Sequence, residues 1–249
     1  LFPYTTLFRS ATAIKNSDAV DRSTKWRLIP RTDNIPRIYG LPKIHKADVP
    51  IRPIVSAINS PTHALAKHLA NLLEPLTGKT VSYLKDSQGF VSKINNLKLS
   101  NNDILVSFDV VSLFTKVPVD DTLDLLKRQL DVNTVQLIEL CLKNTVFSWK
   151  EDVYEQVEGA AMGSPLSPVI ANIYMEHFET RALQTSKLKP KCWFRYVDDT
   201  PVAWPHGPDT LGEFPEHTNS IHVNIQFTME IDEENRLRFG YVSAQESCW

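Results

Sequence analysis

The decisive stretch of the sequence is WFRYVDDTPVAW, residues 193–204. Two apolar segments, Trp193–Val197 and Val202–Trp204, lie on either side of the adjacent acids Asp198 and Asp199. Apolar runs of this length around a polar pair predict a hairpin of two strands with a tight turn at the acids. Two like charges at the tip of such a hairpin repel each other, and a divalent cation would remove that penalty. Adjacent acids recur elsewhere in the chain, so it is this setting that indicates a metal site.

A third acid, Asp109, follows the apolar run Ile104–Phe108, which has the length of a strand. A carboxylate among apolar neighbours is costly unless something neutralises it. A helix N-cap or a salt-bridged strand end is the commoner explanation for a single Asp in such a place. If this strand pairs beside the hairpin, however, three carboxylates converge. Three converging carboxylates suit two Mg²⁺ ions, with Mn²⁺ as a possible substitute, for phosphoryl transfer.

The rest of the chain alternates between helical and extended patterns. Residues 11–60 are rich in proline and basic residues, with extended pieces at 35–39 and 51–56. Apolar spacing predicts helices over 61–76, 88–97, 119–130, 132–144 and 209–221, a further helix after Ser164 or Ser167, a hairpin over 146–157 and a strand over 224–229. This order predicts an α+β fold in which helices cover one face of an antiparallel sheet.

Composition indicates a soluble globular protein whose two parts differ in charge. Of 249 residues, 42 % are hydrophobic and 22 % charged, and no apolar run is long enough to cross a membrane. The three cysteines form no CxxC pair, so neither a zinc site nor a disulfide framework is expected. Residues 1–100 carry 15 Lys and Arg against 6 Asp and Glu, whereas residues 101–249 carry 12 against 23. A basic part could hold phosphates and an acidic part cations; the alternative is chance asymmetry with solvated faces.

Six motifs together resemble reverse transcriptases, and those of Penelope-like retroelements in particular. FDVVSLF (108–114) is similar to the first catalytic motif of the family and YVDD (196–199) to its YxDD motif. The other four, in the family's order, are YGLPKIHK (39–46), RPIVS (52–56), YLKDS (83–87) and AMGSPLSP (161–168). The resemblance implies the fingers and palm of a right-hand polymerase with the thumb missing.

The resemblance also implies a role for each matching residue. Asp109, Asp198 and Asp199 would be the catalytic carboxylates that hold the metal ions. Phe114 would be the steric gate that meets a ribose 2′-hydroxyl, although plain core packing is the alternative. Arg52 would contact the incoming triphosphate, and Lys43 or Lys46 would assist unless they are only solvated. The remaining substrate-contacting positions would be Gly163, Ser164, Pro165 and Tyr196.

The implied activity is that of an RNA-directed DNA polymerase of a retrotransposon. It would transfer nucleotides from dNTPs to a primer 3′-hydroxyl, with an RNA template and a DNA primer as partners. Its place of action would be the nucleus, with no membrane association. Two alternatives stay open: an inactive truncated relic that only binds nucleic acid, and another two-metal enzyme such as a nuclease.

The expected division of the chain follows these motifs. No methionine precedes Met162, and residues 1–10 lack a helical or strand period, so they are interpreted as a translated sequencing adapter. Residues 11–100 would form the fingers and 101–238 the palm. Residues 239–249 match nothing expected of the family and are interpreted as an out-of-frame tail.

Two departures from the family pattern concern catalysis. Residues 205–230 contain no Lys or Arg, and Gln226 stands where the family often has a lysine that would protonate the leaving pyrophosphate. His217 and His222 are then the nearby candidates for an acid, although an isolated histidine is more often a surface or capping residue. Pro201, which follows Asp199-Thr200, removes a possible hydrogen-bond donor from the outgoing strand.

Overall fold

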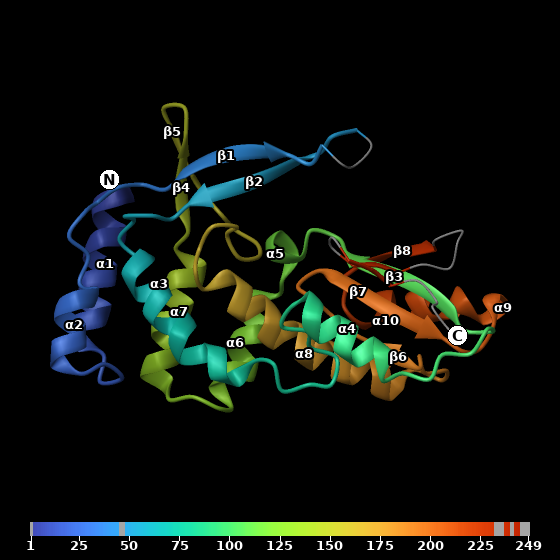
Figure 1. The fold of residues 1–249 in the computed structure, drawn as a ribbon. Coiled ribbons are helices and arrows are strands. Elements are labelled where there is room, and N and C mark those ends of the chain that lie inside the picture. The colour runs from blue at the N-terminus through green and yellow to red at the C-terminus, as the bar shows by residue number, and fades with distance from the viewer. Residues whose placement is uncertain (1, 45–47, 232–236, 240–241, 245–249) are drawn as a thin grey trace. The chain divides into compact units, whose positions relative to one another are not determined.

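The computed structural model describes residues 2–44, 48–231, 237–239 and 242–244 (Figure 1). The chain forms two compact units, each built from two stretches of sequence. The first unit comprises Leu1–Pro75 with Phe114–Tyr174, and the second comprises Leu76–Leu113 with Met175–Trp249. The boundary at residue 100 between fingers and palm is a functional division and stays a prediction.

The first unit contains helices and one sheet. The helices are α1 (Phe2–Asn16), α2 (Arg22–Leu28), α3 (His63–Leu73), α5 (Leu113–Lys116), α6 (Val119–Lys127) and α7 (Val132–Lys143), with a short 3-10 turn at Glu74–Leu76 after α3. Leu65, Leu69 and Leu73 form the buried stripe of α3, spaced as an amphipathic helix requires. Helix α7 begins where the Asp131 carboxylate accepts a hydrogen bond from the Thr134 amide. The predicted helices around residues 61–76, 119–130 and 132–144 are therefore confirmed.

A four-stranded sheet completes the first unit, in the order β2-β1-β4-β5. Strands β1 (Arg37–Pro42) and β2 (Ile51–Ser56) form an antiparallel hairpin, as do β4 (Val146–Trp149) and β5 (Asp152–Glu155). The two hairpins join where β1 runs parallel to β4. Both hairpins lie where the sequence predicted extended segments.

The second unit is built around an antiparallel sheet in the order β6-β7-β3-β8. Its strands are β6 (Cys192–Trp193), β7 (Asp199–Trp204), β3 (Ile104–Val110) and β8 (Phe227–Ile231). Its helices are α4 (Ser87–Asn95), α8 (Ser167–Thr185, which begins in the first unit), α9 (Pro208–Leu211) and α10 (Glu213–Ile221). Strands β9 (Leu237–Phe239) and β10 (Val242–Ala244) pair with each other.

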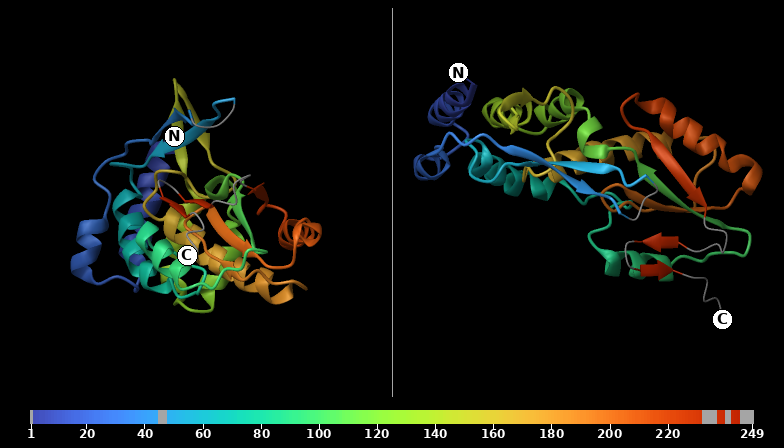
Figure 2. Two further views of the ribbon diagram at one scale, coloured as in Figure 1. Left: turned by 45° about the vertical axis from the view of Figure 1, so that its right-hand side comes forward. Right: turned by 90° about the horizontal axis from the view of Figure 1, so that it is seen from above.

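Helices pack on this sheet because its residues alternate between two faces. On one face, Phe108 of β3 contacts Trp193, Phe214 of α10 and Phe227, and Phe227 contacts Phe178 of α8. On the opposite face, Leu105 and Ala203 pack in a buried cluster with Phe90 and Ile94 of α4. Figure 2 shows the sheet between α10 and α4 in its right-hand view. The predicted α+β fold, with an antiparallel sheet packed on helices, is confirmed, and α4 adds partial cover on the second face.

Some local predictions were wrong. Residues 2–16 are one continuous helix, although the first ten residues showed no helical period. The strand expected over Trp193–Val197 stops at Trp193, and the turn lies at Val197-Asp198, one residue earlier than predicted. The helix expected over 209–221 is divided in two by Gly212. In the described ranges, no helix has the length and hydrophobicity needed to span a bilayer.

Candidate active site

Asp109 and Asp199 lie directly opposite each other on the adjacent strands β3 and β7. The amide and carbonyl of Asp199 both bond with Tyr196, at 3.0 and 2.8 Å, so they point away from β3. Asp109 and Asp199 are therefore a non-hydrogen-bonded pair, the arrangement in which opposite Cα atoms are only about 4.5 Å apart. Their side chains share one face of the sheet and are half-buried. The structure thus brings together two acids 90 positions apart in the sequence.

The third acid, Asp198, lies in the turn between Tyr196 and Asp199. The Asp198 carbonyl accepts a hydrogen bond of 3.1 Å from the Val110 amide, which ties the turn to the end of β3. Val197, the first residue of the turn, has a φ of 57°. A β-branched residue in this left-handed region is a genuine outlier that costs roughly 1–3 kcal/mol and persists only when its surroundings enforce it. The turn that carries the acids is therefore strained.

The acid pair fits a hard divalent cation. Mg²⁺ takes oxygen ligands, and proteins usually bind it through one or two carboxylates plus waters and substrate phosphates, without a cage made wholly of side chains. Among the described residues, no group of three or more His, Cys, Asp or Glu is arranged to hold a metal ion by itself. Two carboxylates on one face of the sheet, with a third acid at the adjoining turn, match the Mg²⁺ pattern.

Comparison with known proteins identifies the family. The profile described as reverse transcriptase (RNA-dependent DNA polymerase) matches residues 44–242. The chain belongs to this reverse transcriptase family. The family is described as one of RNA-dependent DNA polymerases. A search of curated protein sequences gave no match.

Several solved structures share the fold of the chain. Telomerase from Candida albicans, in complex with a TWJ fragment of telomeric RNA, is 12 % identical with a TM-score of 0.59 over 82 % of this chain and 44 % of that one. Apo telomerase from Candida tropicalis has a TM-score of 0.60 at 11 % identity, over 82 % and 46 %. A deletion mutant of the RNA-dependent RNA polymerase of a human picobirnavirus has a TM-score of 0.55 at 13 % identity, over 86 % and 44 %. The chain shares their polymerase palm fold and spans less than half of their length.

The predicted triphosphate-binding residues lie on the β1–β2 hairpin of the first unit. Arg52 is exposed on β2, opposite Leu41. Lys43 follows β1, and its amide donates a 2.9 Å hydrogen bond to the Pro50 carbonyl. Lys46 lies outside the described residues. The structure thus places Arg52 and Lys43 on one hairpin, and their contact with a triphosphate stays a prediction.

The AMGSPLSP segment hydrogen-bonds with β2 of the same hairpin, near the end of that strand. The Val55 amide donates to the Met162 carbonyl at 2.7 Å. Gly163 has a φ of 117°, and a Cβ atom there would lie 2.3 Å from the Val55 carbonyl oxygen. Only glycine fits this approach. Gly163, and Ser164 and Pro165 after it, are therefore adjacent to the strand that carries Arg52, within the first unit.

Phe114, the predicted steric gate, is half-buried in α5 of the first unit. Its carbonyl accepts a 2.7 Å hydrogen bond from the Ala160 amide. At Gly159 a Cβ atom would lie 2.5 Å from that same oxygen, so the backbone of residues 159–160 fixes the backbone of Phe114. Tyr196, by contrast, is an exposed residue of the second unit, adjacent to the acids. The sequence did not indicate Gly159, although a glycine shortly before the AMGSPLSP motif was a visible signal.

Gln226 and the two histidines have other structural partners. The Gln226 side-chain amide donates to the carbonyls of Asn219, His222, Val223 and Ile225 at 3.0–3.3 Å, which caps the end of α10. His217 Nε2 lies 3.2 Å from the Ala182 carbonyl on α8, and His222 Nδ1 accepts from the Asn224 amide. These contacts favour the capping interpretation over a catalytic acid.

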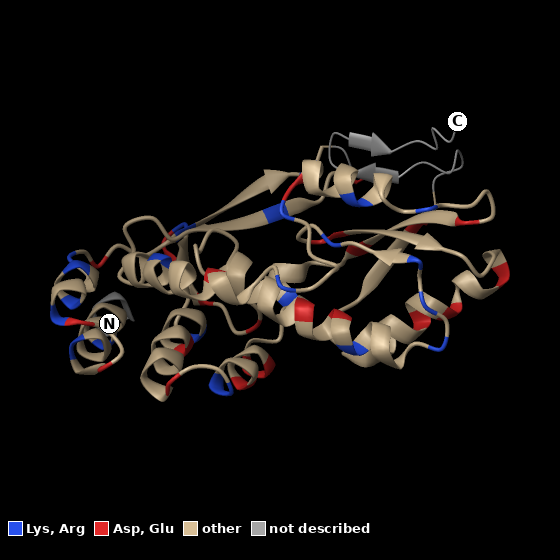
Figure 3. Ribbon diagram, turned by 60° about the horizontal axis from the view of Figure 1, so that its bottom comes forward, with Lys and Arg blue, Asp and Glu red and all other residues tan. Residues whose placement is uncertain are grey.

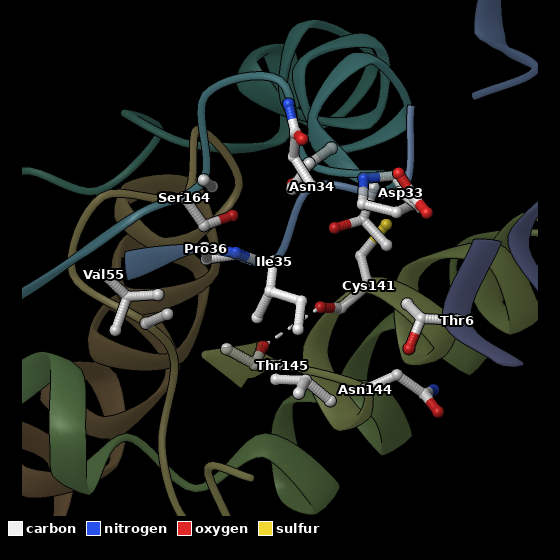
Figure 4. A pocket seen from close by; sticks show the side chains of 17 residues that line it. Thr6, Asp33, Asn34, Ile35, Pro36, Val55, Cys141, Asn144, Thr145 and Ser164 are labelled. Carbon is white, nitrogen blue, oxygen red and sulfur yellow. Dashed lines mark hydrogen bonds between the residues drawn. The ribbon is translucent and has the colours of Figure 1, made fainter. Parts of the chain in front are cut away.

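A small cavity in the first unit lies next to Ser164 (Figure 4). It is lined by Ile35, Pro36, Thr145 and their neighbours, and its volume of about 30 Å³ suffices for one or two water molecules. Ser60 also lines it, and the Ser60 hydroxyl is buried without a hydrogen-bond partner among the described residues. A bound water would satisfy that hydroxyl, whereas a nucleotide is far too large for the cavity.

Basic residues are distributed widely over the ribbon. In Figure 3, Lys and Arg occur on many separate elements with Asp and Glu between them. The positive charge of residues 1–100 is therefore spread over several helices and a hairpin.

Proposed function

We propose that the chain is the fingers-and-palm core of an RNA-directed DNA polymerase from a Penelope-like retrotransposon. It would add nucleotides from dNTPs to the 3′-hydroxyl of a DNA primer on an RNA template, acting in the nucleus where such a primer lies. The observation that carries the proposal is the direct pairing of Asp109 with Asp199 on the central strands of a reverse transcriptase palm.

The acids have one chemical task in this proposal. Asp109 and Asp199, together with Asp198, would hold Mg²⁺, or Mn²⁺ in its place. The chemistry that bound Mg²⁺ supplies is activation of the primer hydroxyl and neutralisation of charge on the leaving pyrophosphate. Phosphoryl transfer needs mainly positioning and charge stabilisation from the protein. A strained turn anchored to β3 provides that positioning, because it fixes the backbone of both adjacent acids.

The first unit would contribute substrate contacts. Arg52 offers a planar guanidinium that can bind two phosphate oxygens at once, and Lys43 offers a point charge. Lys46 would add a second point charge. Phe114, with its backbone fixed by Gly159 and Ala160, would exclude a 2′-hydroxyl and so select deoxynucleotides.

Template-directed extension tests the proposal. The chain is incubated with Mg²⁺, dNTPs and a labelled DNA primer on an RNA template, with enzyme in excess so that a single addition is detected. Asp109→Asn and Asp199→Asn are each expected to lower extension at least 100-fold, because each removes a metal-binding charge. Asp124→Asn, on the exposed surface of α6, is the matched control and should extend like the wild type. Extension that persisted in Asp199→Asn would refute the site assignment.

The relic hypothesis remains the second candidate, since residues 1–100 carry the basic excess. It predicts no extension by the wild type, together with nucleic-acid binding that weakens steeply as salt rises. The nuclease hypothesis predicts Mg²⁺-dependent cleavage of the strand without added dNTPs. Product length on the same gel separates the three functions, because extension lengthens the primer, cleavage shortens it and binding leaves it unchanged.

A further inference from the structure

A buried ion pair contacts the turn that carries the acids. The Arg195 side chain is fully buried, and its Nε atom donates to Glu179 Oε1 of α8 at 2.5 Å. Glu179 is 1 % exposed, and its Oε2 accepts a 2.7 Å hydrogen bond from the Ser82 hydroxyl. Both charges are thus removed from water and bound by several groups within the second unit.

The same guanidinium reaches into the turn. Arg195 Nη1 donates to the Val197 carbonyl at 3.3 Å. The Arg195 backbone is also held on both sides, because its amide donates to the Ser82 carbonyl at 2.7 Å and its carbonyl accepts from the Leu84 amide at 2.8 Å. Arg195 therefore connects α8, the segment around residues 82–84 and the strained turn residue Val197.

Helix α8 holds that neighbouring segment at a second point. Glu176, one turn before Glu179, is buried and accepts a 2.6 Å hydrogen bond from the Gly78 amide. Residues three apart share a helix face, so both carboxylates act from the same side of α8. Gly78 and Ser82 are in this way fixed to one helix, and the segment that pairs with Arg195 has a defined position.

Stability alone does not explain this ion pair. Removing two charges from water costs free energy that their attraction often fails to recover, and apolar residues of similar volume are often as stable. An apolar pair, however, could not donate to the Val197 carbonyl. A residue with a φ of 57° needs surroundings that enforce its conformation. The donor from Arg195 is one such restraint, and it acts one residue before Asp198.

We propose that Arg195 and Glu179 are positioning residues that hold the turn so that Asp198 and Asp199 are presented beside Asp109. The expected loss of kcat rests on the proposed function, whereas the restraint on the turn does not. Glu179 orients the guanidinium, and the guanidinium restrains the Val197 carbonyl. A misplacement of catalytic groups by about 1 Å can lower a rate roughly 100-fold, so a modest loosening of the turn matters.

Two variants separate positioning from stability. The double variant Glu179→Leu/Arg195→Met replaces the pair by apolar side chains and should stay folded while losing the donor to Val197. Arg195→Lys keeps a charge for Glu179 but loses the planar second donor, and it serves as the test if the double variant does not fold. The matched control is Asp103→Asn/Lys191→Met, which removes the ion pair near the opposite ends of the same strands.

Three measurements are made on each folded variant: amide hydrogen exchange at Tyr196 and Asp199, Mn²⁺ binding by electron paramagnetic resonance, and kcat of primer extension. We expect the double variant and Arg195→Lys to exchange these amides at least tenfold faster and bind Mn²⁺ at least tenfold more weakly, with kcat lowered by about 100-fold. The control should exchange and bind at the turn like the wild type. The inference would be overturned if the double variant exchanged these amides and bound Mn²⁺ like the wild type. If the double variant does not fold, the same result in Arg195→Lys would overturn it. Equally faster exchange at the turn in the control would also overturn it.

Failure of the proposed function gives a different pattern. In that case the wild type does not extend a primer, while the exchange and Mn²⁺ data still show whether Arg195 fixes the turn. A variant that recovers both stability and kcat without the ion pair would assign Glu179 and Arg195 a structural role only.

Discussion

Replacing Asp199 by asparagine should stabilise the protein when no divalent cation is present. The substitution keeps the shape of the side chain and removes one of two like charges that lie directly opposite each other on β3 and β7. Like charges in this position destabilise an antiparallel pair. The expected increase in the free energy of unfolding therefore follows directly from the strand register. Asp109→Asn, on the other strand, should give a similar increase.

The magnitude follows from the separation of the two carboxylates. Unit charges about 5 Å apart interact by about 3 kcal/mol at an effective dielectric constant near 20. Asp109 and Asp199 are half-buried, so solvent screening reduces this to about 1 kcal/mol in the free energy of unfolding. For a chain of this size, 1 kcal/mol corresponds to a rise of about 2–4 °C in Tm.

Added Mg²⁺ should reverse the order of stability. A cation that binds only the folded protein adds about 1.4 kcal/mol when its concentration is ten times its Kd. The wild type should gain this amount on titration with MgCl₂, whereas Asp199→Asn should gain much less. Urea unfolding followed by tryptophan fluorescence, in EDTA and in Mg²⁺, measures both effects for each variant.

Asp103, the residue immediately before β3, is the matched control. Its carboxylate is buried and bonded to Lys191, so Asp103→Asn should destabilise the protein by roughly 1–3 kcal/mol in EDTA. Opposite signs for the same substitution at positions 103 and 199 would distinguish a buried acid bonded to Lys191 from an acid that faces another acid across two strands. A wild type more stable in EDTA than both Asp109→Asn and Asp199→Asn would refute the electrostatic argument.

Three further predictions concern single residues. Burial alone would raise the pKa of Asp103, but hydrogen bonds from Lys191 and Ser100 lower this pKa overall. The difference in free energy of unfolding between the wild type and Asp103→Asn should therefore be constant from pH 5 to 7 and shrink below about pH 4. Urea midpoints measured across this pH range check it. Val197→Asn should raise the free energy of unfolding by about 1 kcal/mol, since asparagine tolerates a φ of 57°; destabilisation would contradict the strain. Pro201→Val should supply an amide facing Phe194 and extend β6, seen as hydrogen-exchange protection at residue 201, whereas fast exchange there would show that no such bond forms.

The sequence predicted those features of the fold that depend on local pattern. The stripe of Leu65, Leu69 and Leu73 and the apolar run Ile104–Phe108 became a helix and a strand as expected. The pairing of Asp109 with Asp199 was expected only on condition that the two strands are neighbours. Register between distant strands depends on tertiary packing, here on the aromatic cluster around Phe108, and the sequence does not display it.

The buried pair of Arg195 and Glu179 could not be predicted. In the sequence, Arg195 is one polar residue between Phe194 and Tyr196, and charged residues are rarely buried. Its partner lies 16 positions earlier on a helix, and that helix contacts it only because α8 packs against the sheet. The role of Gln226 was equally hidden, since the sequence showed only that it replaces a lysine of the family, whereas its side chain caps α10.

Pro201 explains why the predicted strand before the acids is short. The Pro201 carbonyl accepts from the Phe194 amide at 3.1 Å, so the proline nitrogen also faces the β6 side and not β3. The ladder between β3 and β7 beside the acids is therefore intact. The ladder to β6 lacks the bond that an amide at position 201 would donate to the Phe194 carbonyl, and β6 ends at Trp193. Phe194 and Tyr196 still bond with Pro201 and Asp199, so the amide and carbonyl of Arg195 between them face the other side, where they bond with Ser82 and Leu84. The donor missing at Pro201 therefore lies apart from the Arg195 contacts that hold the strained turn. The departures from ideal strand chemistry at Pro201, Val197 and the acid pair gather at one end of the sheet, which is where a functional site is expected to break local rules.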